Sequence, residues 1–251
     1  MTNHFLCIDG GGKFRQQRYV SFCGYIDTVV GFTLFKEECS KQLIKHGLYS
    51  LHYTEAMAWE GDDWKRLYDQ WGEERDEKRQ EVLLGFVDVI RRQPSMKAIV
   101  YCADSRLIKE KMATTKRPDL MLFEIALKAA TEQIPPGHHT LSVLCDWEDG
   151  FDVLCCRLLA KLRSQRIANA DKVILLGFGD DRAYAELQAA DMLAYLTCKE
   201  LERRDKRPTE APNPIYSSLM RDIQVRHKAV ANADGLFDAE TFQRMVEAQQ
   251  K

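Results

Sequence analysis

Four aspartates occupy positions at which a carboxylate could take part in catalysis, and Asp191 is the most distinctive. It lies in residues 186–195, a segment rich in Ala, Leu, Met, Gln and Glu that predicts a helix. At helical spacing Asp191 shares one side with Leu187 and Ala194, an apolar stripe of small residues that should face inward. A buried carboxylate is unfavourable unless a cation or hydrogen-bond donors stabilise it. We therefore expect other functional side chains to meet Asp191.

Three more aspartates stand at the ends of short apolar segments that predict β-strands. They are Asp9, Asp104 and Asp146, at the ends of the segments beginning at residues 5, 98 and 140. Ligand sites of open α/β sheets gather at strand ends, although an aspartate there can equally begin a turn or cap a helix. Carboxylates that meet repel one another unless divalent cations lie between them. Such a cluster would suit Mg²⁺ or Mn²⁺, and two ions about 3.5–4 Å apart can promote phosphodiester hydrolysis.

His52 and Glu55 are three residues apart, so in a helical turn both would face the same way. In one interpretation Glu55 is a further metal ligand and His52 carries a proton or orients a group. In the other, both belong to a polar loop under the sheet. Asp181, near the start of the last long helix, is expected to be an N-cap, and membership of the site is the alternative.

Gly10-Gly11-Gly12 follows Asp9 and predicts a sharp turn that leaves room beside it for ions or substrate. The segment lacks the spacing of a phosphate-binding P-loop. Basic residues follow, and they would either flank a phosphate or belong to a solvated surface. These residues are Lys13, Arg15 and Arg18.

The elements that must position these residues alternate between strands and helices. We expect strands at residues 5–8, 18–26, 28–35, 98–102, 140–145 and 173–176. The short link between the second and third favours an antiparallel hairpin. We expect helices at 36–46, 69–92, 119–133 and 151–166, and one from about 182 to 204, with an irregular stretch at 48–64. This order predicts an α/β fold with a mixed sheet flanked by helices.

Composition limits the class of protein. The chain has 251 residues, 45% of them hydrophobic, and a net charge of −2. It therefore lacks the overall basic character expected of a nucleic-acid coat protein. No apolar run reaches the roughly 18 residues of a membrane span, and the N-terminus is too short and polar for a signal peptide. The 8 cysteines form no CxxC pair, which favours buried thiols in a cytoplasmic protein.

Four segments resemble the bacterial "domain of unknown function 3800" family, which is similar to the ribonuclease H-like fold. They are Leu6-Cys7-Ile8-Asp9-Gly10, Leu51-His52-Tyr53-Thr54-Glu55, Val143-Leu144-Cys145-Asp146 and Leu187-Gln188-Ala189-Ala190-Asp191-Met192-Leu193-Ala194. The last, a Gln-x-Ala-Asp helix, is the most specific. Together the segments span roughly residues 4 to 200.

The resemblance implies a ribonuclease H-like domain over residues 1–207, in which an antiparallel three-strand meander precedes parallel strand–helix units. Residues 208–251 would be a C-terminal helical extension packed on the same domain. The resemblance also implies a Mg²⁺ or Mn²⁺ site of Asp9, Asp146 and Asp191, with Glu55 as a fourth catalytic residue. The implied activity is that of a metal-dependent nuclease.

One departure from the family pattern leaves a second class of function open. The family usually has an acidic residue and then Ser-Gly after the first aspartate, where this chain has Gly10-Gly11-Gly12. The chain would then be a catalytically weak module that binds nucleic acid or a partner protein. A third alternative is an assembly protein whose charged residues 73–79 contact a partner, although such a run is usually a solvated face. The sequence does not distinguish RNA from DNA as substrate.

Overall fold

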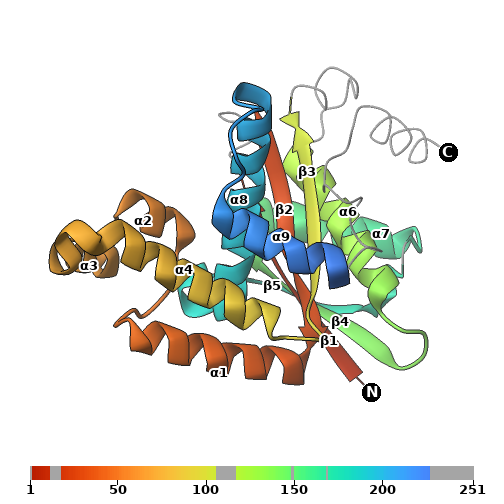
Figure 1. Cartoon of the computed structure of the whole chain (residues 1–251). Coiled ribbons are helices and arrows are strands. Elements are labelled where there is room, and N and C mark those ends of the chain that lie inside the picture. The colour runs from red at the N-terminus through yellow and green to blue at the C-terminus, as the bar shows by residue number, and fades with distance from the viewer. Residues whose placement is uncertain (1, 12–17, 106–116, 148–149, 168, 227–251) are drawn as a thin grey trace.

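In the computed structural model, which describes residues 2–11, 18–105, 117–147, 150–167 and 169–226, one sheet lies between two layers of helices (Figure 1). The described strands are β1 (Thr2–Gly11), β2 (Tyr19–Thr28), β3 (Lys97–Asp104), β4 (His139–Asp146) and β5 (Val173–Gly179). Their order in the sheet is β3-β2-β1-β4-β5. Strand β2 is antiparallel to β1 and β3, and β4 is parallel to β1 and β5. The prediction of an α/β fold with a mixed sheet flanked by helices is confirmed.

Each face of the sheet has its own hydrophobic core. Leu6 and Ile8 of β1 pack with α6 (Pro118–Gln133) and α7 (Phe151–Ser164), whereas Cys7 packs on the opposite side. This alternation follows from the two-residue period of a strand. The helices of the second side are α1 (Val29–Lys45), α2 (Tyr53–Ala58), α3 (Asp62–Trp71), α4 (Arg75–Arg91), α8 (Ala185–Lys206) and α9 (Pro214–Arg226).

The strand expected at residues 28–35 is wrong, because these residues begin helix α1. The Thr28 hydroxyl caps the helix by accepting a hydrogen bond from the Gly31 N–H at 3.2 Å. Along α1 the buried aromatic residues Phe32 and Phe35 follow a helical period, while Val30 is 68% exposed. The apolar and β-branched residues at the start of this amphipathic helix therefore have the sequence pattern of a strand.

The expected meander of three consecutive strands is also wrong, because helices follow the second strand. Strand β3, which contains the segment expected at 98–102, pairs with β2 as the third antiparallel strand. Along the chain, however, the helices α1–α4 separate β3 from β2. The irregular stretch expected at 48–64 contains α2 and the start of α3. The single helix expected at 69–92 is interrupted at Gly72, whose φ of 56° suits glycine.

The described part of the C-terminal segment packs on the core that contains α8. The apolar side chains of α9 that join this core are Ile215, Tyr216, Leu219 and Met220. Residues 227–251 lie outside the described part, so the extension at 208–251 stays a prediction.

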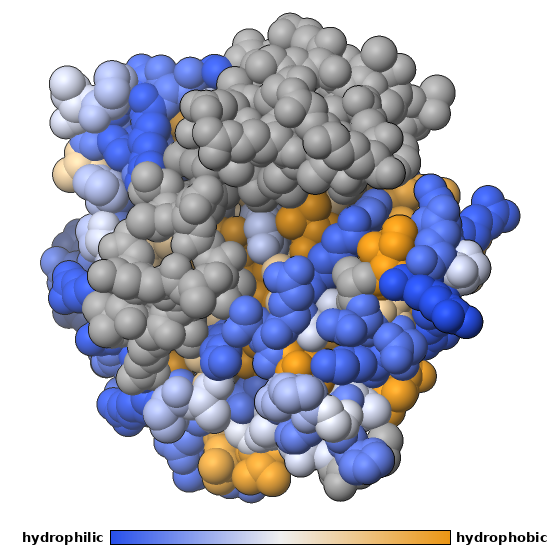
Figure 2. Space-filling model, turned by 90° about the vertical axis from the view of Figure 1, so that its right-hand side faces the viewer, coloured by the Kyte–Doolittle hydropathy of each residue, from blue (hydrophilic) through white to orange (hydrophobic). Residues whose placement is uncertain are grey.

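The visible surface is mixed in character. Figure 2 shows mostly hydrophilic residues, with hydrophobic residues in small separate areas between them. Among the described helices, none combines the length and the apolar character that crossing a membrane requires.

Candidate functional site

Strands β1 and β4 place two aspartates on the same face of the sheet. Cys7 of β1 pairs with Leu144 of β4, and both side chains pack against the core that contains α8. Two residues further along each parallel strand, Asp9 and Asp146 therefore face α8 and lie next to each other. Asp9 is 8% exposed and Asp146 is partly buried.

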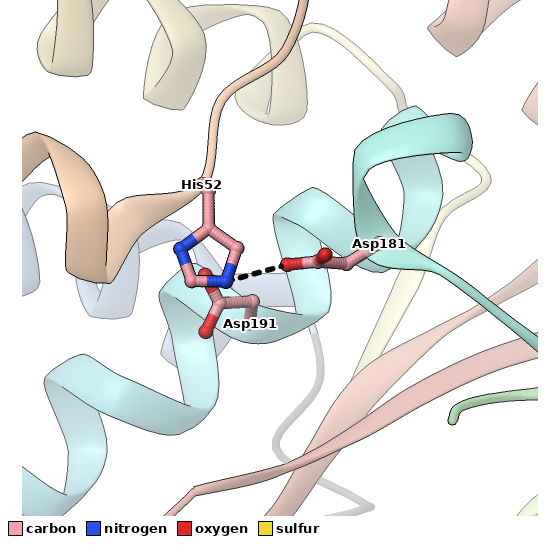
Figure 3. Close-up of side chains that lie close together, drawn as sticks. All are labelled: His52, Asp181 and Asp191. Atoms are coloured by element: carbon pink, nitrogen blue, oxygen red, sulfur yellow. Dashed lines mark ion pairs between the residues drawn. The ribbon is translucent and has the colours of Figure 1, made fainter. Parts of the chain in front are cut away.

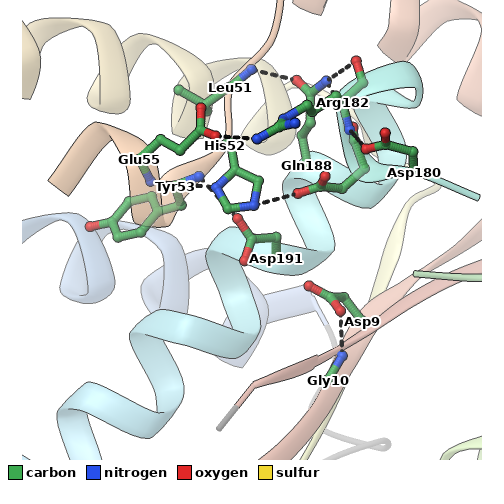
Figure 4. Close-up of polar contacts among 11 residues, drawn as sticks. Asp9, Gly10, Leu51, His52, Tyr53, Glu55, Asp180, Arg182, Gln188 and Asp191 are labelled. Atoms are coloured by element: carbon green, nitrogen blue, oxygen red, sulfur yellow. Dashed lines mark hydrogen bonds and ion pairs between the residues drawn. The ribbon is translucent and has the colours of Figure 1, made fainter. Parts of the chain in front are cut away.

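Helix α8 lies directly against β1 at this point. A Cβ atom on Gly11 would stand 2.7 Å from the carbonyl oxygen of Ala194, closer than any side chain allows. The Ser21 hydroxyl of β2 donates a hydrogen bond to the same oxygen at 3.1 Å. Gly11 thus permits the close approach that brings Asp191 of α8 toward Asp9 (Figure 4).

The turn expected at Gly10-Gly11-Gly12 is corrected by the same geometry. Gly10 and Gly11 continue β1 and pair with residues 22 and 21 of β2, so Asp9 lies within the strand rather than after it. The Gly10 N–H donates to Asp9 Oδ1 at 2.6 Å. Gly12, Lys13 and Arg15 lie outside the described residues.

Asp191 fixes the start of helix α2. Its Oδ2 accepts a hydrogen bond from the Tyr53 N–H at 3.0 Å, which satisfies an N–H that the first turn of a helix leaves unpaired. One turn earlier, the buried Gln188 side chain joins two loops. Its Oε1 accepts from the Leu51 N–H at 2.9 Å, and its Nε2 donates to the carbonyl oxygens of Asp181 and Arg182 at 3.0 and 3.3 Å.

Asp181 belongs to the site, and its expected role as an N-cap is wrong. Asp180 is the cap of the short turn η3 (Asp181–Ala183), where its side chain accepts from the Arg182 N–H at 3.0 Å. Asp181 points inward, is 7% exposed, and its Oδ2 lies 3.2 Å from His52 Nε2 (Figure 3). The ligand atoms of His52, Asp181 and Asp191 all lie within 4.8 Å of one another, a spacing compatible with one cation.

The hydrogen bonds of His52 favour its Nε2 as the protonated nitrogen. Its Nδ1 accepts the Glu55 N–H at 3.4 Å as the N-cap of α2, so in the neutral ring the proton is on Nε2, directed at Asp181. In this arrangement His52 orients the Asp181 carboxylate, and the carboxylates are the better metal ligands.

Glu55 lies at the outer side of the group formed by His52, Asp181 and Asp191. Its carboxylate forms an ion pair with Arg182, whose side chain is 60% exposed (Figure 4). Glu55 still lies near enough to Asp191 to oppose its ionisation. The Arg182 guanidinium thus balances the charge of Glu55 at this margin.

Burial and mutual repulsion raise the pKa values of the inner acids. Burial raises the pKa of Asp9 well above its usual range, and the Asp191 and Asp146 carboxylates add to the effect. Burial also raises the pKa of Asp191, with His52 and the Tyr53 N–H opposing. The pKa of Asp146 is raised by burial too, although the backbone N–H groups of residues 147 and 181 stabilise its ionised form.

The pKa of Asp181 rises to about 7, chiefly because of burial. His52 opposes this increase, and the carboxylates of Asp191 and Asp146 reinforce it. The mutual effects show that Asp9, Asp146, Asp181 and Asp191 form one electrostatic cluster. We call these four residues the carboxylate cluster.

Asp104, the other acid at a strand end, does not join the carboxylate cluster. It ends β3 and lies 2.7 Å from the Nε of Arg18, which also pairs with Asp205 near the end of α8. Of the three strand-end acids predicted from the sequence, Asp9 and Asp146 on the adjacent strands β1 and β4 lie near Asp191, and Asp104 does not.

The donors of the cluster fit a hard divalent cation. They are carboxylate oxygens, the ligands that Mg²⁺ and Mn²⁺ prefer, and within the described part of the chain Asp9 has no ion-pair partner. A cation would offset the repulsion that raises these pKa values. Thus Asp9 and Asp146 lie within electrostatic reach of Asp191 and Asp181, and Glu55 lies at the margin. Among the described residues, the ligand atoms spaced closely enough for one cation are those of His52, Asp181 and Asp191, so the ligand set Asp9, Asp146 and Asp191 stays a prediction.

The sequence favoured a capping role for Asp181, although a signal for the site was present. Asp180-Asp181 follows the apolar strand β5 directly, as Asp146 stands at the end of β4. Because β4 and β5 are parallel neighbours, both acids had to reach the same edge of the sheet.

A comparison of the chain with protein-family models found no matching model, and a comparison with curated proteins found no match either. The family resemblance therefore remains a prediction from four sequence segments, and the site must be interpreted from its own geometry.

Proposed function

We propose that this protein is a divalent-metal-dependent nuclease of ribonuclease H-like fold that hydrolyses phosphodiester bonds. The observation on which this rests is the convergence of four acids from separate segments: Asp9 and Asp146 face α8 from the adjacent strands β1 and β4, and the ligand atoms of Asp181 and Asp191 lie within 4.8 Å of each other. The strand order β3-β2-β1-β4-β5, antiparallel and then parallel, supports the fold assignment.

Asp9, Asp146, Asp191 and Asp181 would hold Mg²⁺ or Mn²⁺. When bound, the cation would supply Lewis-acid catalysis of phosphodiester hydrolysis. His52 would keep the Asp181 carboxylate oriented through the 3.2 Å contact, and the Tyr53 N–H would do the same for Asp191. Arg182, exposed and paired with Glu55, is positioned to attract a phosphate group.

A catalytically weak module that binds nucleic acid or a partner protein is the second candidate function. It is favoured because Gly10 stands where the family has an acid, and because Glu55 and Asp181 already have Arg182 and His52 as partners. Calorimetric titration with MgCl₂ and MnCl₂ separates the candidates, since only the nuclease requires a cation on the carboxylate cluster.

The nuclease is tested by incubating the protein with labelled single-stranded RNA, single-stranded DNA and an RNA–DNA hybrid in the presence of Mn²⁺. We expect cleavage of at least one substrate, abolished by EDTA. Asp9→Asn and Asp191→Asn should lower the rate on the order of a hundredfold or more, because each removes a negative charge from the site.

The asparagine variants keep shape and hydrogen-bond acceptors, so the Asp191→Asn side chain can still accept from Tyr53. Asp171→Asn, an exposed acid in another turn, is the matched control and should retain full activity. If wild type and the Asp9 and Asp191 variants behave alike on all substrates, the nuclease proposal is wrong.

A further inference from the structure

Strand β5 forms one edge of the sheet, and this edge is apolar and exposed. It pairs with β4 and with no other described strand. Its 7 residues, Val-Ile-Leu-Leu-Gly-Phe-Gly, include no charged residue and no proline. Ile174 is 52% exposed and Leu175 is 56% exposed. Because edge strands of monomeric proteins usually carry a charge, a proline or a cover that prevents pairing with another chain, an edge of this composition indicates a partner.

The backbone groups of β5 that point away from β4 follow from one hydrogen bond. The Gly179 carbonyl oxygen accepts from the N–H of Trp147, which continues β4, at 3.0 Å. Gly179 therefore directs its backbone groups toward β4. Because these groups alternate along a strand, those of Phe178 and Leu176 point outward. The pairing with β4 is regular over this stretch, since its register shift lies near the start of β5. The outer side thus presents N–H and C=O groups that another strand can bind.

The exposed apolar surface continues from β5 onto helix α7. A groove of about 460 Å³ lies between the two elements, lined by Leu176 and Phe178 of the strand and by Val153 of the helix, which is 49% exposed. Asp152 and Arg157 also line it, so charges of both signs flank the apolar residues. A strand added to β5 would bring its own side chains over this groove. It would bury apolar area that the single chain leaves in water.

The charges at the two ends of β5 indicate which strand fits. Lys172 precedes the strand, and the exposed Asp180 follows it. When two β5 strands pair antiparallel about their middle residue, Leu176, the Lys172 of each copy lies opposite the Asp180 of the other. A parallel pair would instead place like charges opposite each other, which is unfavourable. The Lys172 ammonium group also donates to the Ile134 carbonyl oxygen at 3.2 Å, which holds it at this end of the strand.

We propose that the edge of β5 pairs antiparallel with the same strand of a second copy of this chain. The result is a twofold dimer in which two five-stranded sheets join into one. Because both copies use the same surface, the dimer covers both β5 edges and is closed. The other edge strand, β3, is largely buried and has Lys97 and Asp104 at its ends, so it lacks these features. The proposal does not depend on the carboxylate chemistry.

Sedimentation-velocity ultracentrifugation of the full chain at a series of micromolar concentrations tests the proposal. We expect wild type to sediment as a dimer that dissociates on dilution. Leu175→Lys places a charge in the interface at a position that is exposed in the single chain, and should raise the dissociation constant about tenfold or more. Val30→Lys, at a 68% exposed position of α1, is the matched control and should leave the constant unchanged. Circular dichroism verifies that both variants fold.

Charge reversal tests the antiparallel register. Lys172→Glu and Asp180→Lys should each raise the dissociation constant about threefold or more, because each replaces two exposed ion pairs by two like-charge contacts. The double variant restores opposite charges and should recover most of the affinity, which a folding defect would not allow. Hydrogen exchange reports the backbone pairing directly. The amides of Leu176 and Phe178 should exchange slowly in the dimer and fast in monomeric Leu175→Lys.

The proposal is overturned if wild type stays monomeric at every concentration, the result expected if residues 227–251 or another protein cover the edge. Open-ended larger assemblies would equally reject a closed dimer. So would equal dimerisation of Leu175→Lys and Val30→Lys, a double charge-reversal variant as weak as the single ones, or fast exchange of the Leu176 and Phe178 amides in the dimer. None of these results changes the expectation of Mn²⁺-dependent cleavage by wild type.

Discussion

Asp181 is the acid of the carboxylate cluster whose protonation is expected to change near neutral pH. Its pKa of about 7 lies well above the value of about 3.9 in an unfolded chain. Between these values the folded state holds the proton that the unfolded state has lost. The free energy of unfolding of the metal-free protein should therefore fall as pH rises from about 4 to 7.

Asp181→Asn should reduce this pH dependence, because the amide does not ionise. In EDTA we expect the variant to be at least as stable as wild type at pH 8, with a smaller loss of stability between pH 5 and pH 8. The slope due to one proton is at most about 1.4 kcal/mol per pH unit. Urea denaturation at several pH values measures it.

Asp180→Asn is the control, since Asp180 is exposed and asparagine also caps a helical turn. Its pH profile should match that of wild type. Parallel profiles for wild type and Asp181→Asn would show that folding does not raise the pKa of Asp181, contrary to the electrostatic account of the cluster.

At the scale of elements, Gln188 connects α8 to the two loops that hold His52 and Asp181. Gln188→Ala leaves the buried Leu51 N–H without its partner. It also removes one hydrogen bond from each of the Asp181 and Arg182 carbonyl oxygens, of which the first still accepts from the Tyr184 N–H. We expect a loss of about 1–3 kcal/mol in the free energy of unfolding. Urea denaturation of wild type and variant measures this loss.

Gln165→Ala at the exposed end of α7 is the matched control and should change stability by less than about 0.5 kcal/mol. Equal effects at the two positions would mean that the Gln188 hydrogen bonds add nothing to the stability of the fold.

The accuracy of sequence-based prediction differed between elements for physical reasons. The pattern of α8 predicted a functional position, because a carboxylate on an inward-facing stripe of small residues is unfavourable without a cation or hydrogen-bond donor. The start of α1 misled because Val29 and Val30 favour strands locally, whereas burial of Phe32 and Phe35 decides for a helix. Local propensity was overridden by packing.

At the scale of the molecule, the sequence indicates some of the carboxylates of the cluster but not how they are held. Strand ends and one helix stripe indicated Asp9, Asp146 and Asp191. The ion pair of Glu55 with Arg182 joins residues 127 positions apart, and no periodicity announces such a pair. Only the assembled sheet determines that Asp181 enters the cluster and that Asp104 does not.

Because the carboxylate cluster exists only when β1, β4, η3 and α8 are assembled, a cation that binds it binds the folded state alone. We expect MnCl₂ to raise the Tm in a concentration-dependent way and EDTA to reverse the effect. At a concentration a hundred times the Kd, the gain in free energy of unfolding is about 2.7 kcal/mol.

The gain in Tm depends on charge in the cluster, so Asp9→Asn and Asp191→Asn should lose most of it, while Asp171→Asn should keep it. Above the raised pKa of Asp9, Asp9→Asn should also raise the Tm in EDTA, because it then removes a buried charge that opposes its neighbours. This opposite effect with and without the ion distinguishes a metal site from a merely acidic core. If Mn²⁺ at millimolar concentration leaves the wild-type Tm unchanged, or stabilises Asp9→Asn equally, the cluster does not hold the cation.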